Sequence, residues 1–160
     1  MTIGRFSAGV AALVRCPADG KYLLLQRSAA KDFGRGAWEC MSGRVDQGES
    51  FADAVRREVR EELGVEVQVE FIIGTMHFYR GAATPDNELV GVQYCCSLAD
   101  PASIRISAEH SVYRWVTLAE AEELLPAGHW LRRAMQRGEA IRALSPPALL
   151  EYYGAEGFDV

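Results

Sequence analysis

The sequence predicts one α/β domain in which helices pack on both faces of a mixed β-sheet. Three observations support this fold class. Segments with strand-like patterning occur in both halves of the chain, one amphipathic helix lies between them, and further helical stretches follow toward the C-terminus. No internal repeat, low-complexity tract or linker interrupts the 160 residues, so a single domain over residues 1–160 is expected.

The strands of the first half are predicted from apolar runs that end at turn or loop residues. Residues 5–15 are rich in Ala, Val and Leu and end at a turn signal. Residues 21–26 (KYLLLQ) form an apolar run typical of a strand buried on both faces. A polar loop is expected over residues 28–36. Residues 38–41 form a short extended segment that leads into a glycine loop at Gly43.

The central helix is bounded by residues suited to capping. Ser50 is a good N-cap, and Asp53 stands at the acidic position of a capping box. Gly64 stands where a left-handed C-cap is expected. Beyond the helix, apolar and polar residues alternate from Val65 to Phe71, which predicts a strand that continues to Tyr79.

The remaining elements complete the expected sheet and the helices that cover it. Two strands are predicted, over residues 88–98 and 113–116, with a polar connection between them. Three helical stretches follow: one capped by Thr117 that runs through Leu125, one over residues 130–136 that stops at Gly138, and one opened by Pro147.

Composition excludes several classes of protein. Hydrophobic residues make up 49% and charged residues 24%, as in ordinary globular domains. No apolar run reaches the roughly 18 residues of a membrane span, and the N-terminus does not have the pattern of a signal peptide. Twenty-two acidic against 17 basic residues give a net charge of −5, which disfavours binding to a nucleic-acid duplex. A small phosphorylated ligand remains compatible with this charge if a cation lies between ligand and protein.

The four cysteines predict a reducing, cytoplasmic setting. Cys16, Cys40, Cys95 and Cys96 do not have the spacing of a metal site. Adjacent Cys95 and Cys96 on a strand point to opposite faces, which is more typical of buried hydrophobic side chains than of a disulfide. Free thiols of this kind fit a cytoplasmic protein.

Three glutamates share one side of the central helix. Glu58, Glu61 and Glu62 stand at positions i, i+3 and i+4, so their carboxylates fall within about 100° of arc. This arc flanks the apolar stripe of the helix, while Arg56 and Arg60 face water. Carboxylates this close repel one another, and partial burial increases the cost. Mg²⁺ or Mn²⁺ would remove the repulsion, because both ions favour carboxylate oxygens and keep positions for water and substrate phosphate.

Two residues ahead of the helix are placed to join such a cation site. Glu49 directly precedes the N-cap, and Gly43 can supply a backbone carbonyl because glycine lets the main chain approach closely. Three glutamates alone are equally compatible with an acidic helix face exposed to solvent.

The complete stretch from Gly43 to Val65 resembles the Nudix box, the motif of the Nudix (MutT-like) hydrolase family. The motif reads G, five residues, E, seven residues, and then R-E-U-x-E-E-x-G-U, where U is aliphatic. The matching positions are Gly43, Glu49, Arg57, Glu58, Val59, Glu61, Glu62, Gly64 and Val65. The strand KYLLLQR, residues 36–39 and residues 109–116 are similar to the family's flanking pattern. Many members read Pro-Gly-Gly where this chain reads Met41-Ser42-Gly43.

The resemblance implies both a fold and an activity. The fold is a Nudix-type α/β/α sandwich with a central mixed sheet and one catalytic helix. The activity is a pyrophosphohydrolase that uses Mg²⁺ or Mn²⁺ and cleaves a nucleoside diphosphate linked to a moiety X, by attack of water on phosphorus. The implied partner is a small-molecule nucleotide. A nucleoside triphosphate, ADP-ribose and a nucleotide sugar all remain open as substrates, and a monomer and a homodimer are both compatible with the sequence.

The resemblance also implies roles for individual residues. Carried over by position, Glu58, Glu61 and Glu62 hold the metal, and the carbonyl of Gly43 is a further candidate ligand. Arg57 is expected to orient a glutamate, and its spacing permits a pair with Glu61 one turn on. The general base varies within the family, so Glu61 and the loop residue Glu109 both remain candidates.

Residues outside the motif are candidates for contact with substrate. Arg27 is suited to phosphate and Trp38 to stacking on a base, with structural roles as the alternative. Tyr79 is a candidate to line the pocket, and Glu88 is a further candidate acid. The three histidines lack ligand spacing and are interpreted as ordinary polar residues: His77, His110 and His129.

Two other functions are compatible with a Nudix-like sequence. A ligand-sensing domain without catalysis commonly loses acids of the motif, whereas this chain keeps them. An enzyme like isopentenyl-diphosphate isomerase needs a cysteine directly before the first glycine of the motif. Here Ser42 occupies that position, and Cys40 lies two residues too early.

Overall fold

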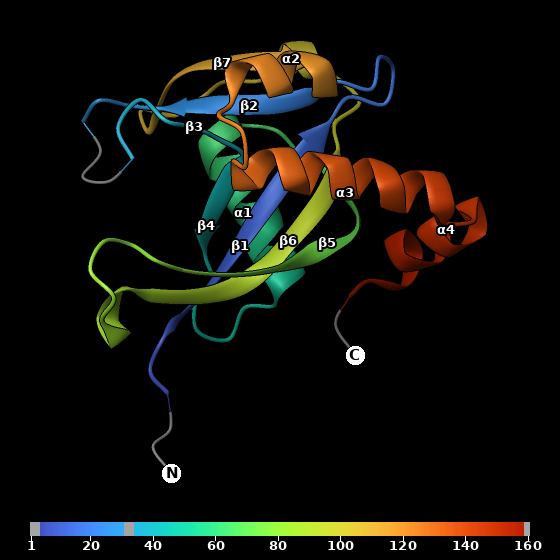
Figure 1. Ribbon diagram of the computed structural model, residues 1–160. Coiled ribbons are helices and arrows are strands. Elements are labelled where there is room, and N and C mark those ends of the chain that lie inside the picture. The colour runs from blue at the N-terminus through green and yellow to red at the C-terminus, as the bar shows by residue number, and fades with distance from the viewer. Residues whose placement is uncertain (1–3, 31–33, 159–160) are drawn as a thin grey trace.

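One mixed sheet carries helices on both of its faces (Figure 1), as predicted from the sequence. The computed structural model describes residues 4–30 and 34–158. Within these residues the seven strands are β1 Ser7–Arg15, β2 Tyr22–Arg27, β3 Trp38–Glu39, β4 Met41–Arg44, β5 Gln68–Tyr79, β6 Glu88–Ser97 and β7 His110–Val116. The α-helices are α1 Phe51–Leu63, α2 Leu118–Leu124, α3 Trp130–Leu144 and α4 Pro147–Glu156.

The sheet divides around its central strand, β1. Strands run in the order β3-β2-β1-β6-β5, with β4 paired to β1 and β7 paired to β2. The β1–β6 pair is parallel, and the other pairs are antiparallel. Strand β2 meets β1 at Arg15 and Tyr22, and β4 then takes its place beside residues Gly9–Ala12 of β1. The part made of β2, β3 and β7 therefore separates from the part made of β1, β6 and β5 (Figure 1).

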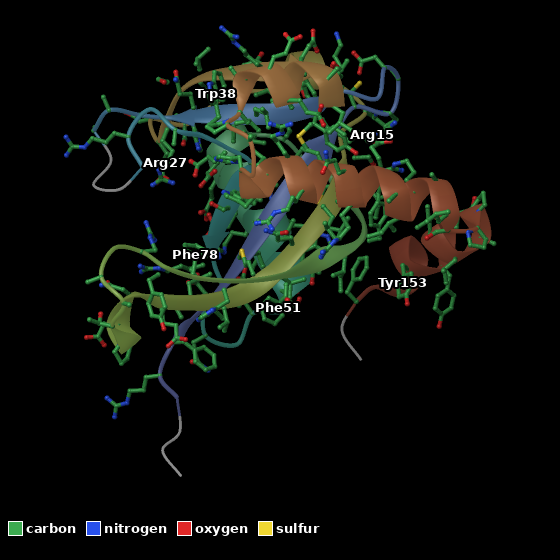
Figure 2. All side chains as sticks on the ribbon, in the orientation of Figure 1. Arg15, Arg27, Trp38, Phe51, Phe78 and Tyr153 are labelled. Atoms are coloured by element: carbon green, nitrogen blue, oxygen red, sulfur yellow. The ribbon has the colours of Figure 1, made fainter. Side chains whose placement is uncertain are left out.

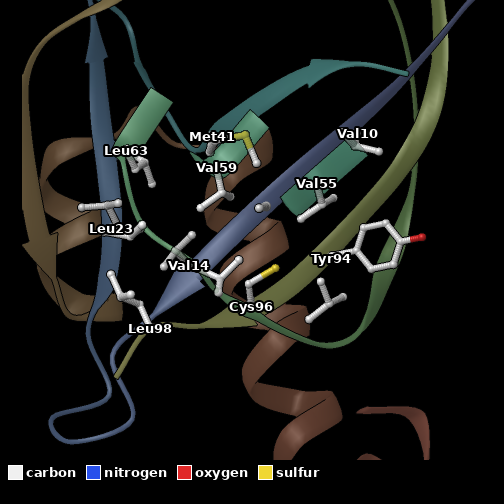
Figure 3. Packing of buried hydrophobic residues seen from close by; sticks show 14 of the residues in the cluster. Val10, Val14, Leu23, Met41, Val55, Val59, Leu63, Tyr94, Cys96 and Leu98 are labelled. Atoms are coloured by element: carbon white, nitrogen blue, oxygen red, sulfur yellow. The ribbon is translucent and has the colours of Figure 1, made fainter. Parts of the chain in front are cut away.

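Alternate residues of β1 build two hydrophobic cores on opposite faces of the sheet. Val10 and Val14 pack toward α1, where Val55 and Val59 are fully buried against them (Figure 3). Ala11 and Leu13 of β1 pack instead toward α2 and α3. This period of two is the pattern expected of a strand covered on both faces. Helix α1 is thereby fixed against β1 and β4 along its apolar stripe.

The predicted caps of α1 are present. The Ser50 hydroxyl accepts a hydrogen bond from the backbone N–H of Asp53 at 3.2 Å, and Gly64 has the left-handed conformation, with φ 66°. The Asp53 carboxylate accepts from the Ser50 hydroxyl at 3.0 Å, so the reciprocal bond of a capping box to the N-cap backbone is replaced by a side-chain contact. The aspartate side chain is shorter than the glutamate that usually reaches back.

Several predicted strand boundaries shift in the structure. Strand β5 begins at Gln68 rather than Val65, and β7 begins at His110 rather than Tyr113. Gly43 lies inside strand β4 and not in a loop, because residues Met41–Arg44 pair with β1. That pairing is long-range, and local sequence patterns do not report it. The predicted loop over residues 28–36 includes residues 31–33, which lie outside the described residues.

The predicted helix stop at Gly138 is wrong, since α3 continues to Leu144. A glycine in a helix interior costs about 1 kcal/mol relative to alanine, and packing on the sheet outweighs that cost. Gly138 is buried close to the side chains of Leu13 and Tyr22. The helix predicted to open at Pro147 is present as α4. No helix in the described part of the chain is long and apolar enough to span a membrane.

Candidate active site

The three glutamates of α1 lie along the flank of the buried stripe, as the helical wheel predicts. The Glu58 and Glu62 side chains are 14% and 9% exposed, whereas that of Glu61 is 60% exposed. The opposite side of the helix carries Arg56 and Arg60, whose side chains are 40% and 58% exposed. We call the side of α1 that carries Glu58, Glu61 and Glu62 the acidic flank. Two of its carboxylates are largely buried, and that of Glu61 is in contact with solvent.

Arg57 is the centre of the ion pairs at this flank. Its Nε and Nη2 atoms donate to the two carboxylate oxygens of Glu49, each at 2.9 Å. Its Nη1 donates to Glu58 Oε1 at 2.9 Å and to Glu61 Oε2 at 3.3 Å. Nη2 also donates to the backbone carbonyl of Arg44 at 2.8 Å. The predicted pair with Glu61 is confirmed, but the carboxylate that Arg57 binds in a bidentate manner is that of Glu49.

This arrangement shifts the pKa values of the charged groups in different directions. The hydrogen bonds from Arg57 hold the pKa of Glu49 below its ordinary value. Burial raises the pKa of Glu58, and the hydrogen bond and charge of Arg57 oppose that rise. The hydrogen bond to Glu49 raises the pKa of Arg57, so its guanidinium stays protonated. Of the two carboxyl groups Glu49 and Glu58, Glu58 therefore holds its proton more strongly.

The glycine at position 43 leaves room for a carboxylate. A Cβ atom added to Gly43 would lie 1.9 Å from Cδ and 2.2 Å from Oε1 of Glu58. Such distances are sterically impossible, so any side chain at this position would displace the Glu58 carboxylate. Strand β4 and helix α1 consequently meet with the backbone of Gly43 directly against the head group of Glu58.

The chemistry of these donors fits a hard divalent cation. All three side chains on the flank offer carboxylate oxygens, which Mg²⁺ and Mn²⁺ prefer. Glu58 and Glu61 already share one positive group, the Nη1 of Arg57. Within the described residues, however, no three carboxylate, histidine or cysteine side chains converge closely enough to form a ready cation site.

The C-terminal end of α1 is fixed by the loop that carries Glu109. The backbone N–H of Ser107 donates to the carbonyl of Glu62 at 2.8 Å, and that of Arg105 donates to the carbonyl of Leu63 at 2.8 Å. Glu109 itself is exposed, and its carbonyl accepts from the N–H of Ser28 at 2.8 Å. The loop and the acidic end of the helix are therefore held side by side through the main chain.

A buried line of charged and polar side chains leads from β2 to the end of α1. Arg27 donates to both carboxylate oxygens of Glu39, at 3.0 and 2.9 Å. Nε2 of His110 lies 3.1 Å from Glu39 Oε1, and its Nδ1 lies 3.9 Å from Glu62 Oε2. Sequence spacing does not indicate this line, because its four members come from β2, β3, α1 and β7. The pattern that resembles the family's flanking sequence does include Glu39 and His110, without assigning them a role.

The three residues predicted to contact substrate lie on two parts of the fold. Arg27 and Trp38 are on the β2–β3 side, whereas Phe78, the neighbour of Tyr79, is on the long β5–β6 arm (Figure 2). Arg27 is bound to Glu39, and the guanidinium of Arg114 lies 5.4 Å from the centre of the Trp38 ring. The Tyr79 ring contacts that of His77 edge-on, at 5.5 Å between centroids.

The remaining candidates have local partners. His77 Nε2 lies 2.8 Å from Glu88 Oε1 on the exposed surface of the β5–β6 arm. Nδ1 of His129 accepts from the N–H of Leu131 at the start of α3, and burial lowers the pKa of this histidine. These contacts agree with the interpretation of His77 and His129 as ordinary polar residues.

All four cysteines are buried and free, which confirms the prediction made for Cys95 and Cys96. Cys95 and Cys96 point into the two opposite cores. Cys40 is 2% exposed, and burial raises the pKa of its thiol. A thiol in this state is a poor nucleophile, so Cys40 is unsuited to replace the cysteine that an isomerase would need at position 42.

A protein-family model of the NUDIX domain matches residues 5–138 of the chain. Among curated proteins, the asymmetrical bis(5′-nucleosyl)-tetraphosphatase of Mus musculus is 31% identical over 128 residues, which cover 79% of this chain and 83% of that protein. The CTP pyrophosphohydrolase of Escherichia coli is 48% identical over 60 residues, 38% of this chain and 42% of that protein. An octanoyltransferase of Myxococcus xanthus is 30% identical over 76% of this chain, which spans only 33% of that longer protein.

Solved structures share the fold over most of the chain. A MutT protein from Methanosarcina mazei superposes with a TM-score of 0.72 at 24% identity, covering 89% of this chain and 99% of that one. The ORF135 protein of E. coli superposes with a TM-score of 0.65 at 26% identity, covering 90% of this chain and 96% of that one.

The family model and the mouse relative thus define the class of protein as one that contains a NUDIX domain. The chain belongs to the Nudix family.

Proposed function

We propose that this protein hydrolyses the pyrophosphate linkage of a small nucleotide and depends on Mg²⁺ or Mn²⁺ bound at the acidic flank of α1. The observation that carries the proposal is the excess of acid around one guanidinium. Glu49, Glu58 and Glu61 surround Arg57, and the Glu58 head group lies against the backbone of Gly43. A bound divalent cation would neutralise this excess and the charge that develops on the phosphoryl oxygens during attack by water.

The residues of the acidic flank would have two roles, binding the cation and orienting its ligands. Glu58, Glu61 and Glu62 would hold the cation, with the carbonyl of Gly43 as a further ligand. Arg57 would orient the acids, because its guanidinium binds Glu49 with two nitrogens and Glu58 with the third. A guanidinium held in this way fixes the direction of each carboxylate that it contacts.

Two acids are candidates for the general base. Glu61 is the exposed member of the flank, and its carboxylate lies 3.3 Å from Nη1 of Arg57, farther than those of Glu49 and Glu58 at 2.9 Å. Glu109 stands on the loop whose main chain is bonded to the end of α1. Either carboxylate would accept the proton of the attacking water. The variant Glu109→Gln separates them, because Glu109 lies outside the proposed ligand set. If Glu109 is the base, Glu109→Gln lowers turnover without weakening binding of the cation; if Glu61 is the base, Glu109→Gln leaves turnover unchanged and Glu61→Gln lowers both turnover and cation binding.

The proposed substrates are nucleoside triphosphates, ADP-ribose and nucleotide sugars. The names of the mouse tetraphosphatase and the bacterial CTP pyrophosphohydrolase support a nucleotide with a polyphosphate chain. Trp38 and Tyr79 remain our candidates for contact with the base. Arg27 is better suited to a structural role than to phosphate binding, because both oxygens of Glu39 accept from its guanidinium.

The proposal is tested by turnover of a nucleotide panel with and without Mg²⁺ or Mn²⁺. Release of phosphate is measured before and after addition of phosphatase, which separates pyrophosphate, monophosphate and sugar-phosphate products. The variant Glu62→Gln keeps the size of the side chain and removes its charge, and we expect it to lower turnover by about a hundredfold or more. Unchanged turnover in Glu62→Gln, or equal turnover in excess chelator, would contradict the metal site.

A further inference from the structure

Four polar side chains from four different elements form a buried line that ends at one of the proposed cation ligands. Arg27, Glu39, His110 and Glu62 each have side chains at most 15% exposed, and that of His110 is 3% exposed. Burial of polar groups is costly unless each is held by a partner. A domain that needed only packing at this place would gain as much from apolar side chains of similar size.

The line holds the imidazole of His110 in one orientation. Glu39 is fixed by the two hydrogen bonds from Arg27 and contacts His110 Nε2 at 3.1 Å. A carboxylate can only accept, so the proton on the ring is directed to Nε2. The backbone N–H of His110 also donates to Ser107, and the N–H of Ser107 donates to the carbonyl of Glu62. The ring is therefore fixed by Glu39, and the main chain of His110 is joined through Ser107 to the end of α1.

The other ring nitrogen faces the glutamate. Nδ1 of His110 is buried, has no hydrogen-bond partner within the described chain, and lies 3.9 Å from Glu62 Oε2. A buried nitrogen placed in this way restricts the rotamers that the Glu62 carboxylate can adopt. Groups around a ligand that restrict its rotamers lower the cost of binding a metal, and their loss commonly weakens the affinity.

We propose that His110, held by Glu39 and Arg27, is a positioning residue that presets the Glu62 carboxylate for the cation. The inference rests on the proposed function of the α1 flank, because it concerns one ligand of that site. His110 acts through Glu62 and does not itself contact the cation or the substrate. Glu39 acts through His110, and its effect depends on the imidazole being present.

The test is the affinity of the full-length protein for Mn²⁺ without substrate, read from the electron paramagnetic resonance signal of free Mn²⁺. His110→Phe keeps a buried ring and removes both nitrogens, and we expect it to weaken Mn²⁺ affinity about tenfold. His110→Asn returns an amide near the position of Nδ1 and is expected to recover part of the loss. Glu39→Gln should weaken affinity by a smaller factor and add nothing in the His110→Phe background, since its effect passes through the imidazole.

Tyr22→Phe provides a matched control on the opposite face of the sheet. Tyr22 is buried and donates its hydroxyl hydrogen to Glu139, so this variant also loses a buried polar contact. We expect a lower melting temperature and unchanged Mn²⁺ affinity. If His110→Phe likewise lowers the melting temperature while leaving Mn²⁺ affinity within about twofold, His110 is structural only and the inference is overturned. If His110→Phe does not fold, Glu39→Gln decides between the same two outcomes.

Glu62→Gln separates this inference from the proposed function. Weaker Mn²⁺ binding in Glu62→Gln with normal binding in His110→Phe and Glu39→Gln overturns the positioning role alone. Unchanged Mn²⁺ binding in Glu62→Gln overturns the cation site itself, and the positioning role with it.

Discussion

Two arginines on opposite faces of the sheet anchor two clusters of charge, and the clusters differ in balance. On α1, Arg57 faces three glutamates at 2.9 to 3.3 Å. On α3, Arg142 faces one, Glu70, at 2.5 Å, and also contacts the sulfur of Cys95 at 3.3 Å. Both guanidinium side chains are 24% exposed, so burial does not distinguish the two clusters. Charge balance does.

The balanced cluster is sufficient to hold a helix against the sheet. Arg142 joins α3 to β5 through Glu70, and its guanidinium also lies 5.3 Å from the centre of the Phe71 ring. Burial and the Glu70 charge raise the pKa of Cys95 to about 12, so the thiol stays neutral. The α1 cluster keeps more carboxylate than one guanidinium neutralises, which costs stability unless another cation joins it. An excess of acid beside an arginine therefore indicates a binding site more clearly than an ion pair does.

Removal of each arginine tests most directly whether the α1 cluster serves activity and the α3 cluster serves stability. Arg57→Ala leaves Glu49, Glu58 and Glu61 without their common donor, and we expect turnover to fall about a hundredfold because the acids lose their orientation. Arg142→Ala is the matched change on α3. We expect it to lower the free energy of unfolding by about 1–3 kcal/mol and to leave turnover unchanged. Steady-state kinetics and urea denaturation of both variants measure the two effects.

Equal loss of turnover in the two variants would contradict the comparison. It would mean that stability, and not charge orientation at α1, limits activity. Arg57→Lys adds a further check. Lysine keeps the charge but cannot bind Glu49 with two nitrogens, so it should recover only a small part of the loss.

The contact between Gly43 and Glu58 allows a second test at the α1 cluster. Gly43→Ala places a Cβ where the Glu58 carboxylate now lies, at 1.9 Å from its Cδ. The displaced carboxylate should bind a cation less well, and we expect turnover at limiting Mg²⁺ to fall about tenfold. A rise in the Mg²⁺ concentration needed for half-maximal activity measures the effect. Wild-type Mg²⁺ dependence in Gly43→Ala would show that Glu58 is not held where the cation binds.

The acidic flank of α1 was predictable because it depends on a local period. Capping by Ser50 and Gly64, burial of the apolar stripe and the shared side of Glu58, Glu61 and Glu62 all follow from residue spacing within one helix. The mixed sheet with helices on both faces was predictable for the same reason, since strand and helix periods differ along the chain.

Contacts between distant segments were not predictable from spacing. Strand β4 exists because residues Met41–Arg44 pair with β1, and the line from Glu39 to His110 joins strands that are 71 positions apart at this contact. Gly138 was predicted to end a helix because local propensity disfavours glycine there. Burial against the sheet reverses that preference, and no local pattern reports it.

The pH dependence of activity tests whether the Glu58 carboxylate of the α1 cluster binds the cation. Burial raises the pKa of this carboxyl above its ordinary 4.5, and Arg57 only partly opposes the rise. The protonated form therefore persists to higher pH than in an ordinary glutamate, and protons compete with the cation for it. We expect turnover at fixed, limiting Mg²⁺ to fall as pH is lowered from alkaline to mildly acidic values. Added Mn²⁺ should restore the lost turnover, which kinetic titration at each pH measures.

A dependence on pH that added cation did not reverse would contradict this account. It would assign the titration to the general base or to the substrate and not to a ligand. Glu58→Gln removes the competing proton together with a ligand, so its remaining activity should show a weaker dependence of cation affinity on pH.

The smallest expected effect concerns a glycine on the α3 side. A Cβ added to Gly138 would meet Tyr22 Oη at 3.7 Å, with Ile73 and Leu13 side-chain atoms at 3.9 Å, all ordinary contact distances. Gly138→Ala should therefore stabilise the protein by about 0.5–1 kcal/mol, because alanine restricts the unfolded chain and favours the helix. Turnover should not change, since α3 lies on the face opposite α1. The midpoint of urea denaturation measures the effect, and a lower midpoint would mean that the helix packs too tightly there for one added methyl group. The two glycines then differ for a steric reason. A Cβ added to Gly138 fits and stabilises the protein, whereas a Cβ added to Gly43 overlaps Glu58 and lowers turnover.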